Sequence, residues 1–114
     1  MDNISKIVEI LRSKKIYSPI IGFPFKAGAN IENYSYESNV DCIALDWSVD
    51  LSWAKTYINK EIVIQGNLDP ASLVPTYSTH LKNNVMSILD ILSDKRFIFN
   101  VGHGLTPDCK IENV

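Results

Sequence analysis

The sequence predicts an α/β protein in which four parallel strands are joined by crossover helices. Four short apolar runs recur along the chain, and stretches with the apolar spacing of helices stand before and between them. The runs are continuously apolar and do not alternate with polar residues, which is typical of strands covered on both faces of a parallel sheet. The alternation of strand and helix favours crossover connections between neighbouring parallel strands.

The helices are expected where apolar residues recur every three or four positions and charged or polar residues fill the other face. In the last of them, Leu81, Val85 and Ile88 lie on one stripe. Asn30 and Ser78 are polar residues of the kind that cap helix N-termini, and each directly precedes an expected helix. The expected helices are Ile4–Lys15, Ile31–Ser38, Val49–Asn59 and Thr79–Leu92.

The strands are expected at the apolar runs, each bounded by residues that form turns. Asn, Asp, Gly and Pro dominate Gln65–Pro70, so this stretch is expected to be a loop. The tail ends on Ile111–Val114, which is expected to be the first turn of a helix that is cut off. The expected strands are Pro19–Phe23, Val40–Leu45, Ile62–Ile64 and Phe97–Asn100.

The charge balance argues against several classes of partner. The chain of 114 residues has a formal net charge of −2 and no block of basic residues, which disfavours nucleic acid and anionic lipid as main partners. The apolar runs are too short to span a bilayer, and the N-terminus lacks the apolar core of a secretory signal. We therefore expect a cytoplasmic protein. Cys42 and Cys109 are expected to be reduced thiols, since they lie far apart without a metal-ligand spacing.

The stretch Phe97–Gly104 is the first candidate for a functional site. An aromatic, apolar run leads into His103, which lies between Gly102 and Gly104. Glycines permit a sharp turn and a close approach of a ligand, and imidazole titrates near neutral pH. An α/β barrel presents reactive residues in this way at the carboxyl ends of its strands. A turn histidine that only satisfies a carbonyl group is an equally good interpretation of this stretch alone.

Several motifs, in this order, resemble the C-terminal region of the uroporphyrinogen decarboxylase family. They are Asp46-Trp47, GNLDP at Gly66–Pro70, and NVGHG at Asn100–Gly104 followed by Pro107-Asp108. The loop Phe23–Gly28 resembles a glycine-containing loop further upstream. The resemblance implies a (β/α)8 barrel that works as a homodimer without a cofactor. It also implies the removal of four acetate carboxyls from uroporphyrinogen III to give coproporphyrinogen III in haem synthesis.

The resemblance further implies that residues 1–114 form the C-terminal half of that TIM barrel. The N-terminal half, which carries an arginine-rich substrate loop in the family, would be absent, and the closing helix would be missing. His103 is the one substrate-binding residue that the resemblance places in this chain. Asp46 and Asp69 follow strands, where aspartate commonly caps a helix or fixes a turn, so we expect structural roles for both. No catalytic residue and no metal ligand is assigned.

Three functional interpretations follow. The first is a C-terminal part of a uroporphyrinogen decarboxylase that is inactive alone. The second is a non-catalytic half-barrel that associates with a separate N-terminal half, because an open sheet leaves edges and one face unpaired. The third is a zinc-dependent methyltransferase of the same barrel superfamily. It is the least favoured, since Cys42 lies within an expected strand and Cys109 in the tail, without the spacing of a zinc site.

Overall fold

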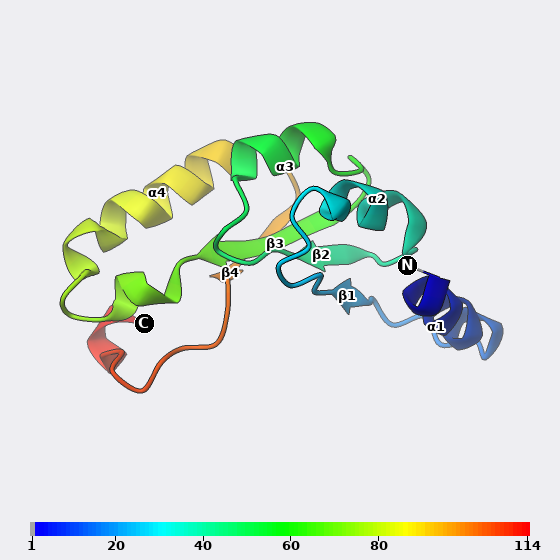
Figure 1. Ribbon diagram of the computed structural model, residues 1–114, viewed down its shortest axis with the longest axis horizontal. Helices are drawn as coiled ribbons and strands as arrows, with labels where there is room; N and C mark the ends of the chain where they lie inside the picture. The colour runs from blue at the N-terminus through cyan, green and yellow to red at the C-terminus, as the bar shows by residue number, and fades with distance from the viewer. Residues whose placement is uncertain (1) are drawn as a thin grey trace.

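The computed structural model describes residues 2–114 and contains one four-stranded sheet (Figure 1). The strand order is β1-β2-β3-β4, and every neighbouring pair is parallel, which confirms the predicted α/β architecture with crossover connections. The strands lie side by side in the order in which they occur along the chain, as consecutive strands of an α/β barrel do. They are β1 Ile21–Gly22, β2 Cys42–Ala44, β3 Val63–Leu68 and β4 Phe97–Val101.

Helices α2, α3 and α4 cover one face of the sheet, while α1 projects beyond β1 at one end of the molecule (Figure 1). No helix within residues 2–114 has both the length and the apolar character needed to cross a membrane. The α-helices are α1 Asp2–Ser13, α2 Asn30–Glu37, α3 Leu51–Tyr57 and α4 Leu81–Leu92, and the short 3-10 helices are η1 Pro70–Leu73, η2 Ser78–His80 and η3 Ile111–Asn113.

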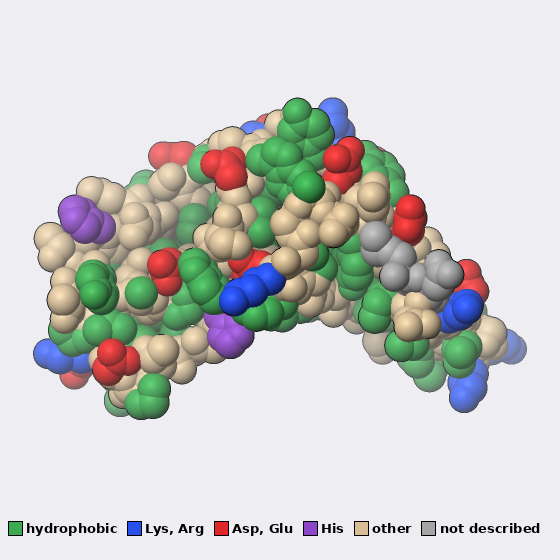
Figure 2. Space-filling view, in the orientation of Figure 1, with side chains coloured by type: hydrophobic (Ala, Val, Ile, Leu, Met, Phe, Trp, Pro, Cys, Tyr) green, Lys and Arg blue, Asp and Glu red, His purple; other side chains and the backbone are tan. Residues whose placement is uncertain are grey.

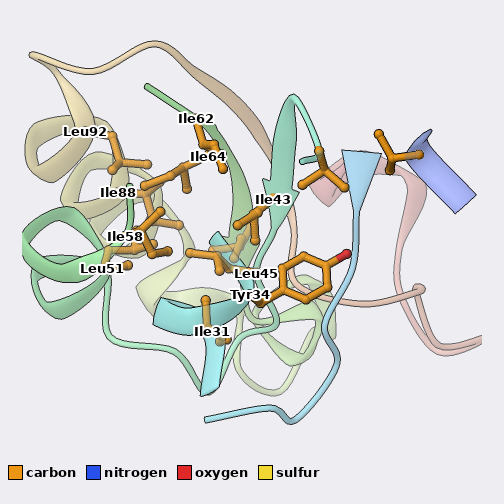
Figure 3. Packing of buried hydrophobic residues seen from close by; sticks show 14 of the residues in the cluster. Ile31, Tyr34, Ile43, Leu45, Leu51, Ile58, Ile62, Ile64, Ile88 and Leu92 are labelled. Atoms are coloured by element: carbon orange, nitrogen blue, oxygen red, sulfur yellow. The ribbon is translucent and has the colours of Figure 1, made fainter. Parts of the chain in front are cut away.

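The core lies between the sheet and the three covering helices (Figure 3). Ile43 of β2 and Ile64 of β3 are paired in register on this face and are fully buried. The helices contribute Ile31, Ala54 and Leu92, which are also inaccessible to solvent. Burying an aliphatic side chain of this size contributes about 1.5–3 kcal/mol, so this single layer of contacts supplies most of the stability of the chain.

The opposite face of the sheet has no covering layer among the described residues. Ile21 and Ile98 point away from the helices and are 50% and 44% exposed. The radius of gyration is 15.3 Å, whereas a compact chain of this length would have about 13 Å. The coverage of both faces that the apolar runs indicate is therefore not found in this chain by itself, because α2, α3 and α4 lie on one side and α1 projects beyond β1.

Strand β3 is longer than predicted. The stretch Gln65–Leu68 was expected to be a loop, but it continues β3 and pairs in register with Ile98–Val101 of β4. By their intrinsic preference, asparagine and glycine are uncommon in strands. Here the backbone hydrogen bonds to β4 override that preference, so the first half of the GNLDP motif lies within the sheet.

Two predicted helix caps are also wrong. Asn30 is the first residue of α2, and Ala29 precedes it without a side-chain cap. Ser78 does not cap α4, because its hydroxyl donates to the carbonyl of Pro75 and a 3-10 turn separates it from the helix. The predicted helical turn in the tail is likewise a 3-10 turn over Ile111–Asn113. Helix ends placed from residue preferences commonly differ by one or two residues from the observed ones.

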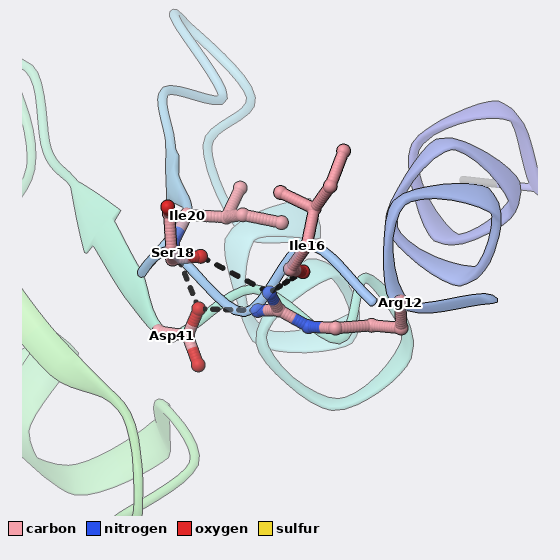
Figure 4. Close-up of polar contacts among 5 residues, drawn as sticks. All are labelled: Arg12, Ile16, Ser18, Ile20 and Asp41. Carbon is pink, nitrogen blue, oxygen red and sulfur yellow. Dashed lines mark hydrogen bonds and ion pairs between the residues drawn. The ribbon is translucent and has the colours of Figure 1, made fainter. Parts of the chain in front are cut away.

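Arg12 connects α1 to the sheet (Figure 4). Its guanidinium donates to the carbonyls of Ile16 and Ser18 at 2.9 and 3.0 Å, and it lies 2.8 Å from the Asp41 carboxylate. The same Asp41 oxygen accepts from the Ile20 N–H at 2.7 Å. One arginine thus holds the turn after α1 and the approach to β1 in a fixed arrangement with the start of β2.

The one-sided packing of the sheet gives a direct prediction for stability. Ile43→Ala should lower the free energy of unfolding by about 2–5 kcal/mol, because it leaves a cavity in the only packed layer. The matched change Ile98→Ala, on the uncovered face, should lower it by less than about 1 kcal/mol. Urea unfolding followed by circular dichroism measures both values. Equal losses would show that the second face is packed in solution.

Candidate functional site

The candidate site lies at the carboxyl edge of the sheet, where four successive loops meet. His103 lies two residues beyond β4, and Trp47 follows β2. Phe23 and Phe25 belong to the loop after β1, and Asp69 follows β3 directly. The position expected for His103 at a strand terminus is confirmed. In parallel α/β proteins this edge is where ligands bind.

Asp46 holds the loop after β2 in place. Its side chain is only 2% exposed, and it accepts hydrogen bonds from the Ser48 hydroxyl, the Ser48 N–H and the Lys26 N–H. Burial alone raises the pKa of this carboxyl, but these hydrogen bonds and the charge of Lys26 outweigh that effect, and the pKa lies below its usual value. Asp46 is therefore an ionised structural anchor, as expected, and it ties the β1 loop to the β2 loop.

Asn67 holds the loop after β2 against the end of β3. Its buried side-chain amide donates to the carbonyls of Asp46 and Val49, both at 2.8 Å. Gly66, the preceding residue, has a φ of +139°, and a Cβ there would lie 2.9 Å from the Leu45 carbonyl oxygen. Glycine is required at this position both for its backbone conformation and for the close approach of β2.

Gly102 allows the loop after β4 to reach the loop after β2. A Cβ at Gly102 would lie 2.3 Å from the backbone nitrogen of Trp47, and the Gly102 N–H donates to the Leu68 carbonyl at 2.7 Å. The absent side chain thus permits a protein contact across β3. Gly104, on the other side of His103, has open space around it.

Phe23, Phe25, Trp47 and His103 form the aromatic cluster of the site. The ring of His103 has its centroid 5.1 Å from that of Phe25, 5.7 Å from that of Trp47 and 6.4 Å from that of Phe23. The Trp47 and His103 rings are nearly perpendicular, at 88°. The ammonium of Lys26 lies over the Phe25 ring, 5.3 Å from its centre.

The histidine separates two cavities. One, of about 480 Å³, is lined by Trp47, Tyr77, the carboxylates of Asp69 and Asp108, and neighbouring loop residues. The second, of about 530 Å³, lies against the uncovered face of the sheet, and His103 and Gly104 line both. The space-filling view shows one histidine at the lower edge of the molecule, near the middle of its long axis, with a basic side chain directly beside it (Figure 2). Neither cavity is lined by lysine or arginine.

The remaining polar candidates have structural partners. Asp69 accepts from the Ala71 N–H at 2.9 Å at the start of η1, as expected of a cap, and Asn100 accepts from the Val101 N–H. Cys42 and Cys109 are both free thiols. Burial and the charge of Asp41 raise the pKa of the Cys42 thiol. Within residues 2–114 no three His, Cys, Asp or Glu side chains group together as a metal site would require.

Sequence reasoning found His103 but missed the rings beside it. Phe23 and Phe25 carried one usable signal, since two large apolar residues directly after a strand face solvent unless something packs on them. Trp47 is 39% exposed, so it is not a core residue of this chain. Its contact with His103 depends on the approach of two loops that are more than fifty residues apart in sequence.

The fold and the site together define a class, namely enzymes built on parallel α/β barrels with the functional residues at the carboxyl ends of the strands. A family model described as uroporphyrinogen decarboxylase (URO-D) matches residues 1–114, and the chain belongs to this family. The family fold is a TIM barrel, of which these four strands form a part.

Curated relatives agree with this assignment. The chain is 40% identical over 110 residues to a uroporphyrinogen decarboxylase of Orientia tsutsugamushi (strain Boryong), covering 96% of this chain and 32% of that protein. It is 37% identical over 109 residues to one of Wolbachia pipientis wMel, covering 96% of this chain and 31% of the relative. The chain therefore spans about a third of the length of the curated relatives that it matches.

The anchoring role of Asp46 predicts a specific dependence of stability on pH. Because the pKa of its carboxyl is lower in the folded state than in the unfolded state, its contribution is present above about pH 4 and is lost as the pH falls further. Asp46→Asn should lower the free energy of unfolding by about 1–3 kcal/mol at neutral pH and flatten its decline in acid. Urea unfolding at several pH values measures both effects.

Asp94→Asn is the matched control. The Lys55 ammonium, which donates a hydrogen bond to Asp94, lowers the pKa of that carboxyl as well, but the Asp94 side chain is 66% exposed. Solvent screens such a pair, so its removal should leave the acid decline nearly unchanged. An Asp46→Asn variant as stable as the parent at neutral pH would contradict the anchor.

Proposed function

We propose that this chain supplies the C-terminal part of a uroporphyrinogen decarboxylase. The whole enzyme would convert uroporphyrinogen III to coproporphyrinogen III by removing four acetate carboxyls in haem biosynthesis. The match of the family to residues 1–114 carries the proposal. The presence of His103 at the carboxyl edge, beside two open cavities, supports a substrate-binding role for that residue.

His103 is proposed to donate a hydrogen bond to a carboxylate of the substrate. An exposed imidazole at the rim of a cavity can reach such a group, and a hydrogen bond to a charged acceptor is among the stronger ones. Loss of CO2 from an acetate arm leaves an electron pair that protonation of the pyrrole ring can accept. A positioned acid is therefore also needed, and we propose that His103 takes part in that proton transfer in the whole enzyme.

The chain is proposed to be inactive alone, with no cofactor required. A substrate with eight carboxylates needs several cations or donors to replace its hydration. The cavity beside Trp47 instead carries Asp69 and Asp108, which would repel it. The missing positive charge must come from the part of the enzyme that this chain does not span. Homodimer formation remains a prediction from the resemblance, and a cytoplasmic location remains a prediction from the composition and the N-terminal sequence.

A joined enzyme tests the role of His103. In it, this chain replaces the corresponding C-terminal part of the Orientia tsutsugamushi relative, so that the N-terminal part of the relative supplies the rest of the barrel. His103→Ala should lower kcat/KM for uroporphyrinogen by about 10- to 100-fold, the equivalent of one hydrogen bond to a charged group. His80→Ala, in the exposed η2 turn, is the control and should change nothing. Unchanged kinetics in the His103 variant would refute the assignment.

A second candidate function is a half-barrel that pairs with a separately made N-terminal half. The exposed surface of the chain favours it. Ile98 and Ile21 lie on the uncovered face of the sheet, and Ile4, Ile7 and Ile10 expose 38–54% of their surface on α1. Exposed apolar residues on two parts of the surface favour an interaction with another chain. The relatives are about three times longer than the matched part, so the remainder of the barrel is the occupant of suitable size.

Mixing separates the two candidates. This chain and the N-terminal part of the Orientia relative are purified apart, mixed, and examined by size-exclusion chromatography and a decarboxylase assay. Pairing should give a stable complex with activity, and Ile98→Asp should weaken it by placing a charge in the interface. Met86→Asp, at similar exposure on the outer surface of α4, is the control. Activity in the joined enzyme but none on mixing would reject the second candidate.

A further inference from the structure

The imidazole of His103 is exposed to solvent but is flanked by rings from two other loops. Phe25, from the loop after β1, approaches it with centroids 5.1 Å apart, and Trp47, from the loop after β2, approaches it edge-on at 5.7 Å. No hydrogen bond to the His103 side chain is present among the described contacts of this region. The rings are therefore the contacts that limit how the imidazole can turn.

The two rings are themselves held firmly. Phe25 donates its N–H to the Phe23 carbonyl at 2.9 Å, and the next residue, Lys26, donates its N–H to the buried Asp46 carboxylate. Trp47 follows Asp46 directly, and its backbone lies against Gly102. The backbone segments that carry both rings are thus tied to the same anchor, whereas His103 is followed by Gly104, which has open space around it.

We propose that Phe25 and Trp47 are positioning residues, which hold the His103 imidazole in one orientation between the two cavities. The proposal rests on the proposed substrate-binding role of His103. Perpendicular and tilted aromatic contacts at these distances favour a defined ring arrangement. A donor that is already oriented loses less rotational freedom when it binds a carboxylate, so affinity improves without a new contact to the substrate.

The first experiment measures the orientation of the ring directly. The chain is labelled with 13C and 15N at histidine, and the imidazole resonances are recorded by NMR. Aromatic rings displace the signals of protons held close to them, so the His103 signals should differ from those of His80, which has no ring contact among the described residues. Phe25→Leu and Trp47→Leu should each move the His103 signals toward those of His80, while Phe25→Tyr should keep them near their parental values.

The second experiment measures the consequence for binding in the joined enzyme. Phe25→Leu and Trp47→Leu should raise KM about 3- to 10-fold with little change in kcat, since they weaken binding in the ground state and transition state alike. Phe25→Tyr should restore the parental KM. Tyr57→Leu is the matched control, because it removes an exposed ring from the Trp53–Tyr57 stack on α3, away from the site.

The outcomes distinguish this proposal from the proposed function. Parental His103 signals that equal those of His80 would overturn the positioning role. It would equally be overturned if His103→Ala impaired the joined enzyme but both ring variants kept the parental KM. If instead His103→Ala itself left the kinetics unchanged, the substrate-binding role would fail, whatever the NMR signals showed about the orientation of the ring.

Discussion

The buried carboxylate of Asp46 is the contact on which the carboxyl edge depends. It receives the N–H of Lys26 from the loop after β1, while the carbonyl of the same residue receives the amide of Asn67 from β3. The adjoining Trp47 backbone lies against Gly102 after β4. Three loops and the end of strand β3 are therefore joined through two consecutive residues. A buried charge is tolerated here because hydrogen bonds replace the water that it loses.

This arrangement holds the loops of the carboxyl edge in place but supplies only part of the site that we propose there. Residues of this chain form the aromatic cluster and line the two cavities beside His103. The charged residues that line the cavity beside Trp47, however, are Asp69 and Asp108, and both are acidic. The uncovered face of the sheet and one side of α1 likewise expose apolar residues that nothing within the described residues covers. Packing and electrostatics thus agree that the molecule presents one part of a larger barrel, as its coverage of about a third of its relatives also indicates.

Much of this fold could be predicted from the sequence, and the exceptions depend on contacts that apolar spacing does not record. The order of strands and helices followed from apolar spacing, which is a local property. The extension of β3 through Gln65–Leu68 did not, since it depends on hydrogen bonds to β4 about thirty residues away. The cap expected at Asn30 failed because that residue already lies inside α2, and the one at Ser78 failed because its hydroxyl is bonded to the carbonyl of Pro75. At the site, His103 was found from its glycines, but Phe25 was not.

The sequence by itself determined the parallel α/β class, the ordered motifs that identify the family, and the histidine at the end of the last strand. Each depends on residue type and spacing along the chain. Only the tertiary structure decided that Gly102 serves a protein contact, that Asp46 joins the loops, and that Phe25 and Trp47 flank the imidazole. These are contacts between distant segments, and their geometry exists only once the strands have aligned in the sheet.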